Sequence, residues 1–130
     1  MPRRTSCIIG KEGNIEIIKG DCAFDTNELI DIIVSFANKL GLDVDVEDDD
    51  SGYKLEIDGK ERYYDFSDTD DMIEKIISDA NQKEGDLTYL RNDNRDLMIL
   101  FKKDSPITDE ELEKIKLKNE DFFNAEWWYF

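Results

Sequence analysis

The sequence predicts an α+β domain in which antiparallel sheets carry helices on one face, with the elements in the order ββαβββαββα. Short segments of alternating apolar and polar residues, joined by turn residues, are typical of half-buried strands. Longer segments with an apolar residue every three or four positions are typical of amphipathic helices. No linker or low-complexity segment interrupts the 130 residues. We therefore expect a single acidic domain over residues 1–130 with an aromatic C-terminal tail.

A hairpin and a helix are expected first. The apolar segments Cys7–Ile9 and Ile15–Ile18 lie on either side of a polar turn. Asp25 is expected to begin the helix, because its carboxylate can accept hydrogen bonds from the free N–H groups of the first turn, and Glu28 completes a capping-box pattern. Gly41 is placed to end this helix, since glycine readily adopts the left-handed conformation.

Three strands and a second helix are expected next. Apolar and polar residues alternate in the strands, which are expected at residues 42–47, 53–57 and 62–66. Asp58 and Gly59 are a strong signal for a tight turn between the last two strands. The helix is expected to begin near Asp68, with acidic residues at its positive end. Gly85 is expected to close it.

Another hairpin and a third helix are expected in the last third of the chain. Leu87–Arg91 and Asp96–Lys102 are the expected strands, and the second is apolar on both faces, which is typical of a central strand. Thr108 and Glu111 form a capping-box pattern, and the helix that they begin is expected to end near Asn119.

Charge is the strongest feature of the composition, with 33 Asp and Glu against 17 Lys and Arg and a net charge of −16. Such a surface repels nucleic acid and anionic lipid and attracts basic proteins. The chain shows no secretion signal and no apolar run approaching the ~20 residues of a membrane span. We expect a cytoplasmic protein that binds a basic protein but neither nucleic acid nor a membrane, with Cys7 and Cys22 as reduced thiols.

The residue types that most catalytic sites require are missing. Without histidine, the chain lacks the commonest general base and metal ligand. Two cysteines cannot form a four-ligand zinc site, and no glycine-rich phosphate loop is present. Residues 43–54 do not fit a calcium loop, because Asp48 stands where glycine is required. We predict no enzymatic activity, no cofactor and no metal; carboxylate-held magnesium is the remaining enzymatic alternative.

Acidic residues in the middle of the chain form the candidate binding surface. Asp43, Asp45 and Glu47 alternate with apolar residues, so their carboxylates share one face of a strand at a spacing of ~6.6 Å. A solvated outer face explains this alternation. It does not explain why Lys54 is the only cation expected there, because like charges on adjacent strands are unfavourable. We therefore interpret this surface as a binding face. The predicted partner-binding residues are Asp43, Asp45, Glu47, Asp48, Asp49, Asp50, Glu56, Asp58, Asp65, Asp68, Asp70 and Asp71.

The aromatic C-terminus is a second candidate interface, formed by Trp127, Trp128, Tyr129 and Phe130. Aromatic residues near carboxylates are typical anchors of protein interfaces. If the last helix continues into the tail, Trp127 and Phe130 share one helix face with Phe123. Alternatively, the tail folds back and covers the core of its own domain.

The segment from Asp25 to Asn81 combines the order helix, three antiparallel strands, helix with a very acidic surface. In these two properties it resembles certain small phage-encoded anti-CRISPR proteins, which mimic DNA and block the channel in which an RNA-guided nuclease reads its target. The resemblance covers less than half of the chain and rests on no shared motif, so it assigns no role to an individual residue. It implies an inhibitor that occupies a basic nucleic-acid-binding surface.

We therefore expect a non-enzymatic inhibitor of the DNA-mimic type, directed against a CRISPR effector, a restriction enzyme or another nuclease. Charge complementarity serves an immunity protein that neutralises a basic toxin equally well. A third alternative is a structural or assembly subunit that docks through the aromatic C-terminus.

Overall fold

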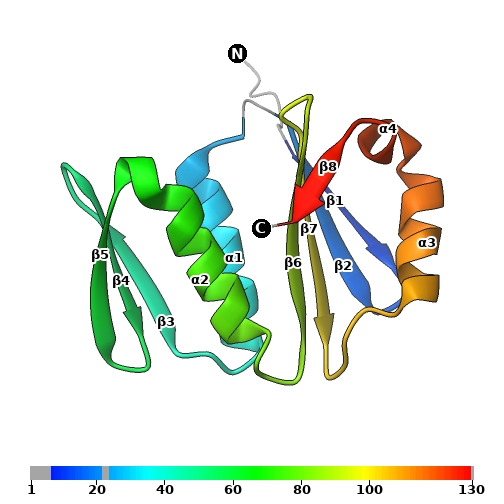
Figure 1. The fold of residues 1–130 in the computed structure, drawn as a ribbon. Helices are drawn as coiled ribbons and strands as arrows, with labels where there is room; N and C mark the ends of the chain where they lie inside the picture. The colour runs from blue at the N-terminus through cyan, green and yellow to red at the C-terminus, as the bar shows by residue number, and fades with distance from the viewer. Residues whose placement is uncertain (1–6, 22–23, 130) are drawn as a thin grey trace, which may run out of the picture.

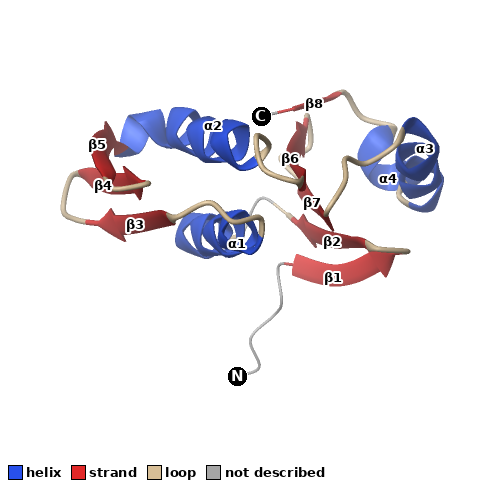
Figure 2. Cartoon of the chain, turned by 90° about the horizontal axis from the view of Figure 1, so that it is seen from below, coloured by secondary structure: helices blue, strands red, loops and turns tan. Residues whose placement is uncertain are grey.

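Four layers of secondary structure follow one another across the molecule in the computed structural model (Figures 1 and 2), which describes residues 7–21 and 24–129. A three-stranded sheet is followed by one helix pair, a five-stranded sheet and a second helix pair. The elements are β1 (Cys7–Glu12), β2 (Ile15–Gly20), α1 (Thr26–Lys39), β3 (Val44–Asp48), β4 (Gly52–Ile57), β5 (Lys60–Asp65), the 3-10 helix η1 (Phe66–Asp68), α2 (Thr69–Ala80), β6 (Gly85–Asn92), β7 (Leu97–Lys103), α3 (Asp109–Lys118), α4 (Glu120–Phe123) and β8 (Trp127–Tyr129). Cys22 and Phe130, named in the sequence predictions, lie outside the described residues.

Both sheets are antiparallel, with the strand orders β1-β2-β7-β6-β8 and β3-β4-β5. The predicted α+β class and the predicted order of strands and helices are confirmed, and the structure adds η1, α4 and β8. The prediction of a central strand is confirmed for β7, which pairs with β2 and β6 and is buried at every position except Lys103.

Helices cover both faces of the five-stranded sheet, whereas we expected them on one face. On one face, α1 and α2 pack against residues such as Tyr89 and Ile99. On the other, Ile115 of α3 and Phe122 of α4 pack against residues such as Met98. The apolar residues of β7 point to both faces, and both must be removed from water, so a single helix layer could not bury this strand.

The three-stranded sheet is covered on one face only. Its inward side chains, including Val44, Tyr53, Leu55 and Ile57, are buried in the same core as α1 and α2. The alternation in β3 and β4 therefore corresponds to the two faces of the sheet, as predicted. The apolar residues pack against the helices, and the polar residues that alternate with them face outward. Figure 2 shows this sheet at one end of the molecule, beyond the helix pair.

The helix ends follow the predicted signals in part. The carboxylate of Asp25 accepts a hydrogen bond from the Asn27 N–H at 3.0 Å, while the structure does not show the reciprocal bond from Glu28. Gly41, at φ 98°, follows the end of α1 as expected. The prediction for Gly85 is wrong: α2 ends at Ala80, and Gly85 begins β6 at φ 148°. A Cβ there would lie 2.6 Å from the Lys102 carbonyl oxygen, so the position requires glycine for close packing.

Of the two alternatives for the tail, the structure shows the one in which the chain folds back, and the last helix does not continue. Asn119 leaves the helical conformation at φ −133°, and after the single turn of α4 the chain forms β8, which pairs with β6. The buried side chain of Asn92 supports this arrangement by donating to the Phe122 carbonyl at 3.1 Å and by accepting from the Asn94 and Asp96 N–H groups at 3.0 Å. The tail therefore covers the core of its own domain.

Candidate protein-binding surface

Alternate residues of the three-stranded sheet, nearly all of them polar, point away from α1 and α2 and form one continuous surface. Register places residues of β3, β4 and β5 directly opposite one another, and alternation sends every second side chain outward. We call this surface the outer acidic face, and its residues are Asp45, Glu47, Lys54, Glu56, Glu61, Tyr63 and Asp65.

One row across the outer acidic face consists of three carboxylates. Asp45 pairs with Glu56, and Glu56 pairs with Glu61. Side chains at directly opposite positions of antiparallel strands have Cβ atoms about 5 Å apart, and like charges there are destabilising. The sheet therefore places three negative charges side by side with no cation in the row.

The adjacent row contains Lys54, the one cation of the outer acidic face. Its Nζ lies 3.5 Å from Glu47 Oε2 and 4.0 Å from Glu61 Oε2. The negative charge of Glu47, and after it that of Glu61, raises the pKa of the Lys54 ammonium. All three side chains remain about half exposed or more, so water screens these ion pairs. One lysine leaves most of the acidic charge uncompensated.

Three further predicted residues lie at the end of β3 and in the turn that follows it, and one of them has a structural role. Asp49 Oδ1 accepts hydrogen bonds from the N–H groups of Ser51 at 2.9 Å and Gly52 at 3.0 Å, and from the Tyr63 hydroxyl at 3.2 Å. These bonds, with the backbone bond from Ser51 contributing most, lower the pKa of Asp49. Asp49 thus shapes the turn and connects it to β5, while Asp48 and Asp50 are exposed.

The predicted acidic residues of η1 and α2 do not join the outer acidic face. Asp68 and Asp71 line a hollow of about 590 Å³ between β5 and α2. Asp70 lines a separate hollow of about 320 Å³ together with Arg91. Because successive residues of a helix point about 100° apart, neighbouring acids of one helix face different parts of the molecule.

Asp43 and Asp58 lie at one end of the small sheet. The Asp58 N–H donates to the Asp43 carbonyl at 2.8 Å, and both side chains are exposed. The twelve predicted binding residues thus fall into three groups: those on or beside the outer acidic face, those at the end of β3 and in the β3–β4 turn, and those in η1 and on two sides of α2.

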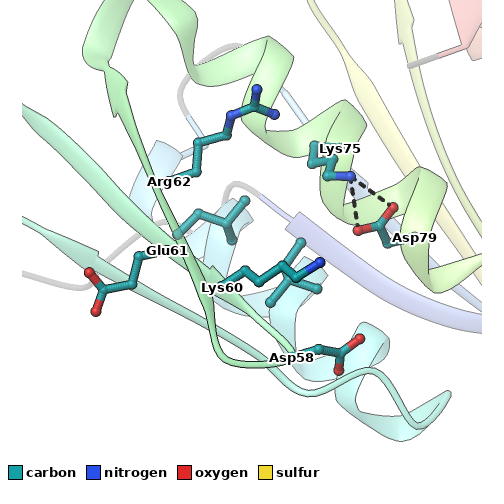
Figure 3. Close-up of a pocket in the computed structure, with 8 residues that line it drawn as sticks. Asp58, Lys60, Glu61, Arg62, Lys75 and Asp79 are labelled. Atoms are coloured by element: carbon teal, nitrogen blue, oxygen red, sulfur yellow. Dashed lines mark hydrogen bonds and ion pairs between the residues drawn. The ribbon is translucent and has the colours of Figure 1, made fainter.

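Sequence reasoning missed Glu61 and a hollow on the inner side of the β4–β5 hairpin. The hollow has a volume of about 380 Å³, and Lys60, Arg62 and Lys75 contribute to its lining (Figure 3). Lys75 forms an ion pair with Asp79 at 3.2 Å, and Glu61 lines the hollow while its carboxylate points away from it. We expected the strand to begin at residue 62, whereas the two-residue turn already pairs Ile57 with Lys60. The Asp58-Gly59 signal could have located this start.

The aromatic tail offers a small exposed surface. Trp127 is half-buried, and its ring packs edge-to-face with Phe123 at 5.3 Å between centroids. The Lys116 Nζ lies 5.1 Å from the centroid of the same ring. Trp128 and Tyr129 are 43% and 56% exposed. Of the predicted secondary interface, these two side chains are the ones that the structure leaves open to a partner.

Acidic charge is concentrated in the half of the molecule that carries the small sheet. Residues 26–80 contain 17 of the 33 acidic residues but only 5 of the 17 basic ones. The remaining residues are close to balanced, with 16 acidic and 12 basic. The negative electrostatic potential is therefore strongest at one end of the molecule.

Within the described residues, no three cysteine, aspartate or glutamate side chains are placed to hold a metal ion. None of the helices in the same part of the chain has the length and apolar character needed to cross a membrane. Comparisons of the chain with protein-family models, with curated proteins and with solved structures found no match.

Proposed function

We propose that this protein is a non-enzymatic cytoplasmic inhibitor whose outer acidic face occupies a basic nucleic-acid-binding surface of a partner protein. The carboxylate row Asp45–Glu56–Glu61 is the observation that carries the proposal. Like charges in one row cost stability. A partner that places lysine or arginine side chains among them relieves this repulsion, and the relief contributes to the free energy of binding.

The arrangement of charge supports a mimic of nucleic acid. Carboxylates lie about 5 Å apart across the strands and ~6.6 Å apart along them. This is a regular array, although a duplex carries its charges more densely, one per ~1.7 Å of its axis. The same half of the chain has the order of elements in which the sequence resembles DNA-mimicking anti-CRISPR proteins. A nuclease or another nucleic-acid-binding enzyme is the partner class that this array fits.

The proposal is tested by neutralising the carboxylate row without changing its shape. In the triple variant Asp45→Asn, Glu56→Gln, Glu61→Gln, the partner loses the charges that it binds. The tagged wild-type and variant proteins are used to capture partners from a lysate of the source organism at low salt, with duplex DNA or RNA as competitor. We expect the wild type to capture a nucleic-acid-binding enzyme that the competitor displaces, and the variant to capture at least about tenfold less.

A matched control removes the same charge from the opposite end of the molecule. Glu110, Glu113 and Asp121 are exposed, and the variant Glu110→Gln, Glu113→Gln, Asp121→Asn is expected to capture the partner nearly as well as the wild type. If the row variant captures it equally well, the proposal is wrong. If nucleic acid does not displace the captured partner, the proposal of an inhibitor at a nucleic-acid-binding surface is rejected. The alternative of an immunity protein that neutralises a basic toxin then takes its place.

A further inference from the structure

β5 is an edge strand with one open side. Among the described strands its only neighbour is β4, and five of its six residues are exposed. An open edge presents a row of backbone N–H and C=O groups that another extended chain can bind. Figure 1 shows β5 at the outer side of the molecule, next to α2.

The turn geometry defines which backbone groups of β5 point outward. The two-residue turn at Asp58 and Gly59, with φ values of 51° and 85°, makes Ile57 and Lys60 a hydrogen-bonded pair. Hydrogen-bonded and non-bonded pairs alternate along an antiparallel ladder. The backbone groups that face the open edge therefore belong to Glu61, Tyr63 and Asp65. Within the described part of the chain, the backbone groups of Glu61 and Tyr63 have no partner, whereas the Asp65 C=O, at the N-cap of η1, accepts in the first turn of that helix.

A groove runs beside β5 on its inner side. The hollows of about 590 Å³ and about 380 Å³ both include Arg62 and Lys75 in their lining, so they adjoin one another. We call them together the β5–α2 groove. A strand added to β5 would place every second side chain in this groove. Strand-addition sites gain their affinity from backbone hydrogen bonds and their specificity from such hollows for alternate side chains.

Charge identifies the occupant. Outward side chains of an added strand would lie beside Glu61 and Asp65 and would extend the carboxylate row by one position. Inward side chains would enter a groove in which Asp68, Asp71 and Glu74 lie together with Arg62 and Lys75, so its charge is nearly balanced. The outward side of the added strand therefore selects lysine or arginine, and the inward side does not require them.

We infer that β5 binds an extended, lysine- or arginine-rich segment of the partner by strand addition. This inference rests on the proposed function and specifies how the partner is held. Of the other edges, those of β3 and β8 are less suitable. The Val44 N–H at the start of β3 already donates to the Asn38 side chain at 3.4 Å, and β8 has only three residues.

Amide hydrogen exchange with a defined probe gives a direct test. The probe is a capped eight-residue peptide of alternating lysine and threonine, added to the ¹⁵N-labelled protein at low salt. We expect the amides of Glu61, Tyr63 and Asp65 to exchange more slowly with the peptide bound. The amides of Arg62 and Tyr64, already bonded to β4, change little. Binding that leaves the first three amides unprotected, or no binding at all, overturns the inference.

A pair of substitutions at one position separates the backbone from the side chain. Both Glu61→Ala and Glu61→Pro remove the carboxylate, and only the second removes the N–H at the open edge. Proline is tolerated on an edge strand where its nitrogen faces solvent. We expect the proline variant to bind the peptide about tenfold more weakly than the alanine variant. Equal affinities would exclude strand addition.

Arg62→Pro checks the assigned alternation. The Arg62 N–H faces β4, so proline there breaks the ladder and is expected to lower the melting temperature, whereas Glu61→Pro retains a melting temperature close to that of Glu61→Ala. A melting temperature that is lowered by Glu61→Pro and not by Arg62→Pro would contradict the inference.

The two proposals fail in different ways. If neutralising the carboxylate row abolishes partner capture while Glu61→Pro and Glu61→Ala behave alike, the outer acidic face stands and strand addition is wrong. If Glu61→Pro weakens peptide binding and the captured partner ignores nucleic acid, strand addition stands and the mimic is wrong.

Discussion

Glu111 shows how one side chain can connect two elements. Its carboxylate accepts a hydrogen bond from Lys102 Nζ at 2.7 Å and from the Thr108 N–H at 3.0 Å, and its own N–H donates to Thr108 Oγ1. The capping box that the sequence predicted is thus confirmed. The sequence could not reveal that the nearly buried ammonium of Lys102, on β7, binds the same oxygen, because that contact depends on the packing of α3 against the sheet.

These contacts predict a specific pH dependence. The hydrogen bond from Lys102, followed by that from the Thr108 backbone, lowers the pKa of Glu111 from 4.5 to about 2. A lowered pKa in the folded state means that the ionised carboxylate stabilises the fold above pH 4.5 and that this stabilisation is lost as the pH falls from 4.5 to about 2. We expect Glu111→Gln to melt below the wild type at pH 7 and together with it near pH 2, in thermal unfolding monitored by circular dichroism. A pH-independent difference would contradict this assignment.

The pattern of residue types along single strands also explains how much of the candidate site could be predicted from the sequence. The outward placement of Asp45, Glu47 and Glu56 followed from alternation alone, which is a local property of strands. Whether Asp68 and Asp70 join the same surface depends on how α2 is rotated against the sheet, which local pattern does not specify. Asp49 was counted as a binding residue because the sequence shows its charge but not the hydrogen bonds that occupy it.

At the scale of elements, strands and helices with strong periodicity were predicted in the correct order. The exceptions are elements that depend on distant partners. β8 has three aromatic residues and no alternating pattern, and its place beside β6 relies on contacts such as the Asp93 N–H with the Glu126 carbonyl at 3.0 Å. The helices on the second face of the five-stranded sheet are a similar case. The sequence shows that β7 has two apolar faces, which require helices on both sides of the sheet, and the prediction of helices on one face does not meet this requirement.

The carboxylate row predicts opposite effects of one variant on stability and on binding. In Asp45→Asn, Glu56→Gln, Glu61→Gln, two unfavourable cross-strand pairs disappear, each worth roughly 0.2–1 kcal/mol. The exposed Lys54–Glu61 ion pair is lost with them, which offsets a small part of this gain. The isolated variant should therefore be more stable than the wild type by about 0.5–1 kcal/mol, a rise of a few degrees in melting temperature. Urea unfolding measures the free energy of unfolding directly. The control at Glu110, Glu113 and Asp121 should show a smaller change, and a destabilised row variant would mean that the row is not under repulsion.

For the whole molecule, the net charge of −16 and its concentration in residues 26–80 make the response to salt informative. Added salt screens repulsion between exposed carboxylates, with a screening length of about 10 Å at 0.1 M. We expect the melting temperature to rise by a few degrees between about 0.01 and 0.5 M sodium chloride. The row variant should show a smaller rise, since it lacks part of the repulsion. A melting temperature that falls with salt would contradict the charge-repulsion argument.

The layer order also has a consequence for how the chain folds as it is synthesised. The segment from α1 to α2 is contiguous, so its contacts are local and form without waiting for later residues. The five-stranded sheet instead pairs β2 with β7, across that whole segment, and contacts between distant residues form slowly. On a ribosome, the β1–β2 hairpin therefore stays without its neighbour until β7 has emerged. We expect β8 to be the last strand added, at the end of translation, so a chain truncated before residue 127 retains the small sheet and its helices but leaves the edge of β6 open to other proteins.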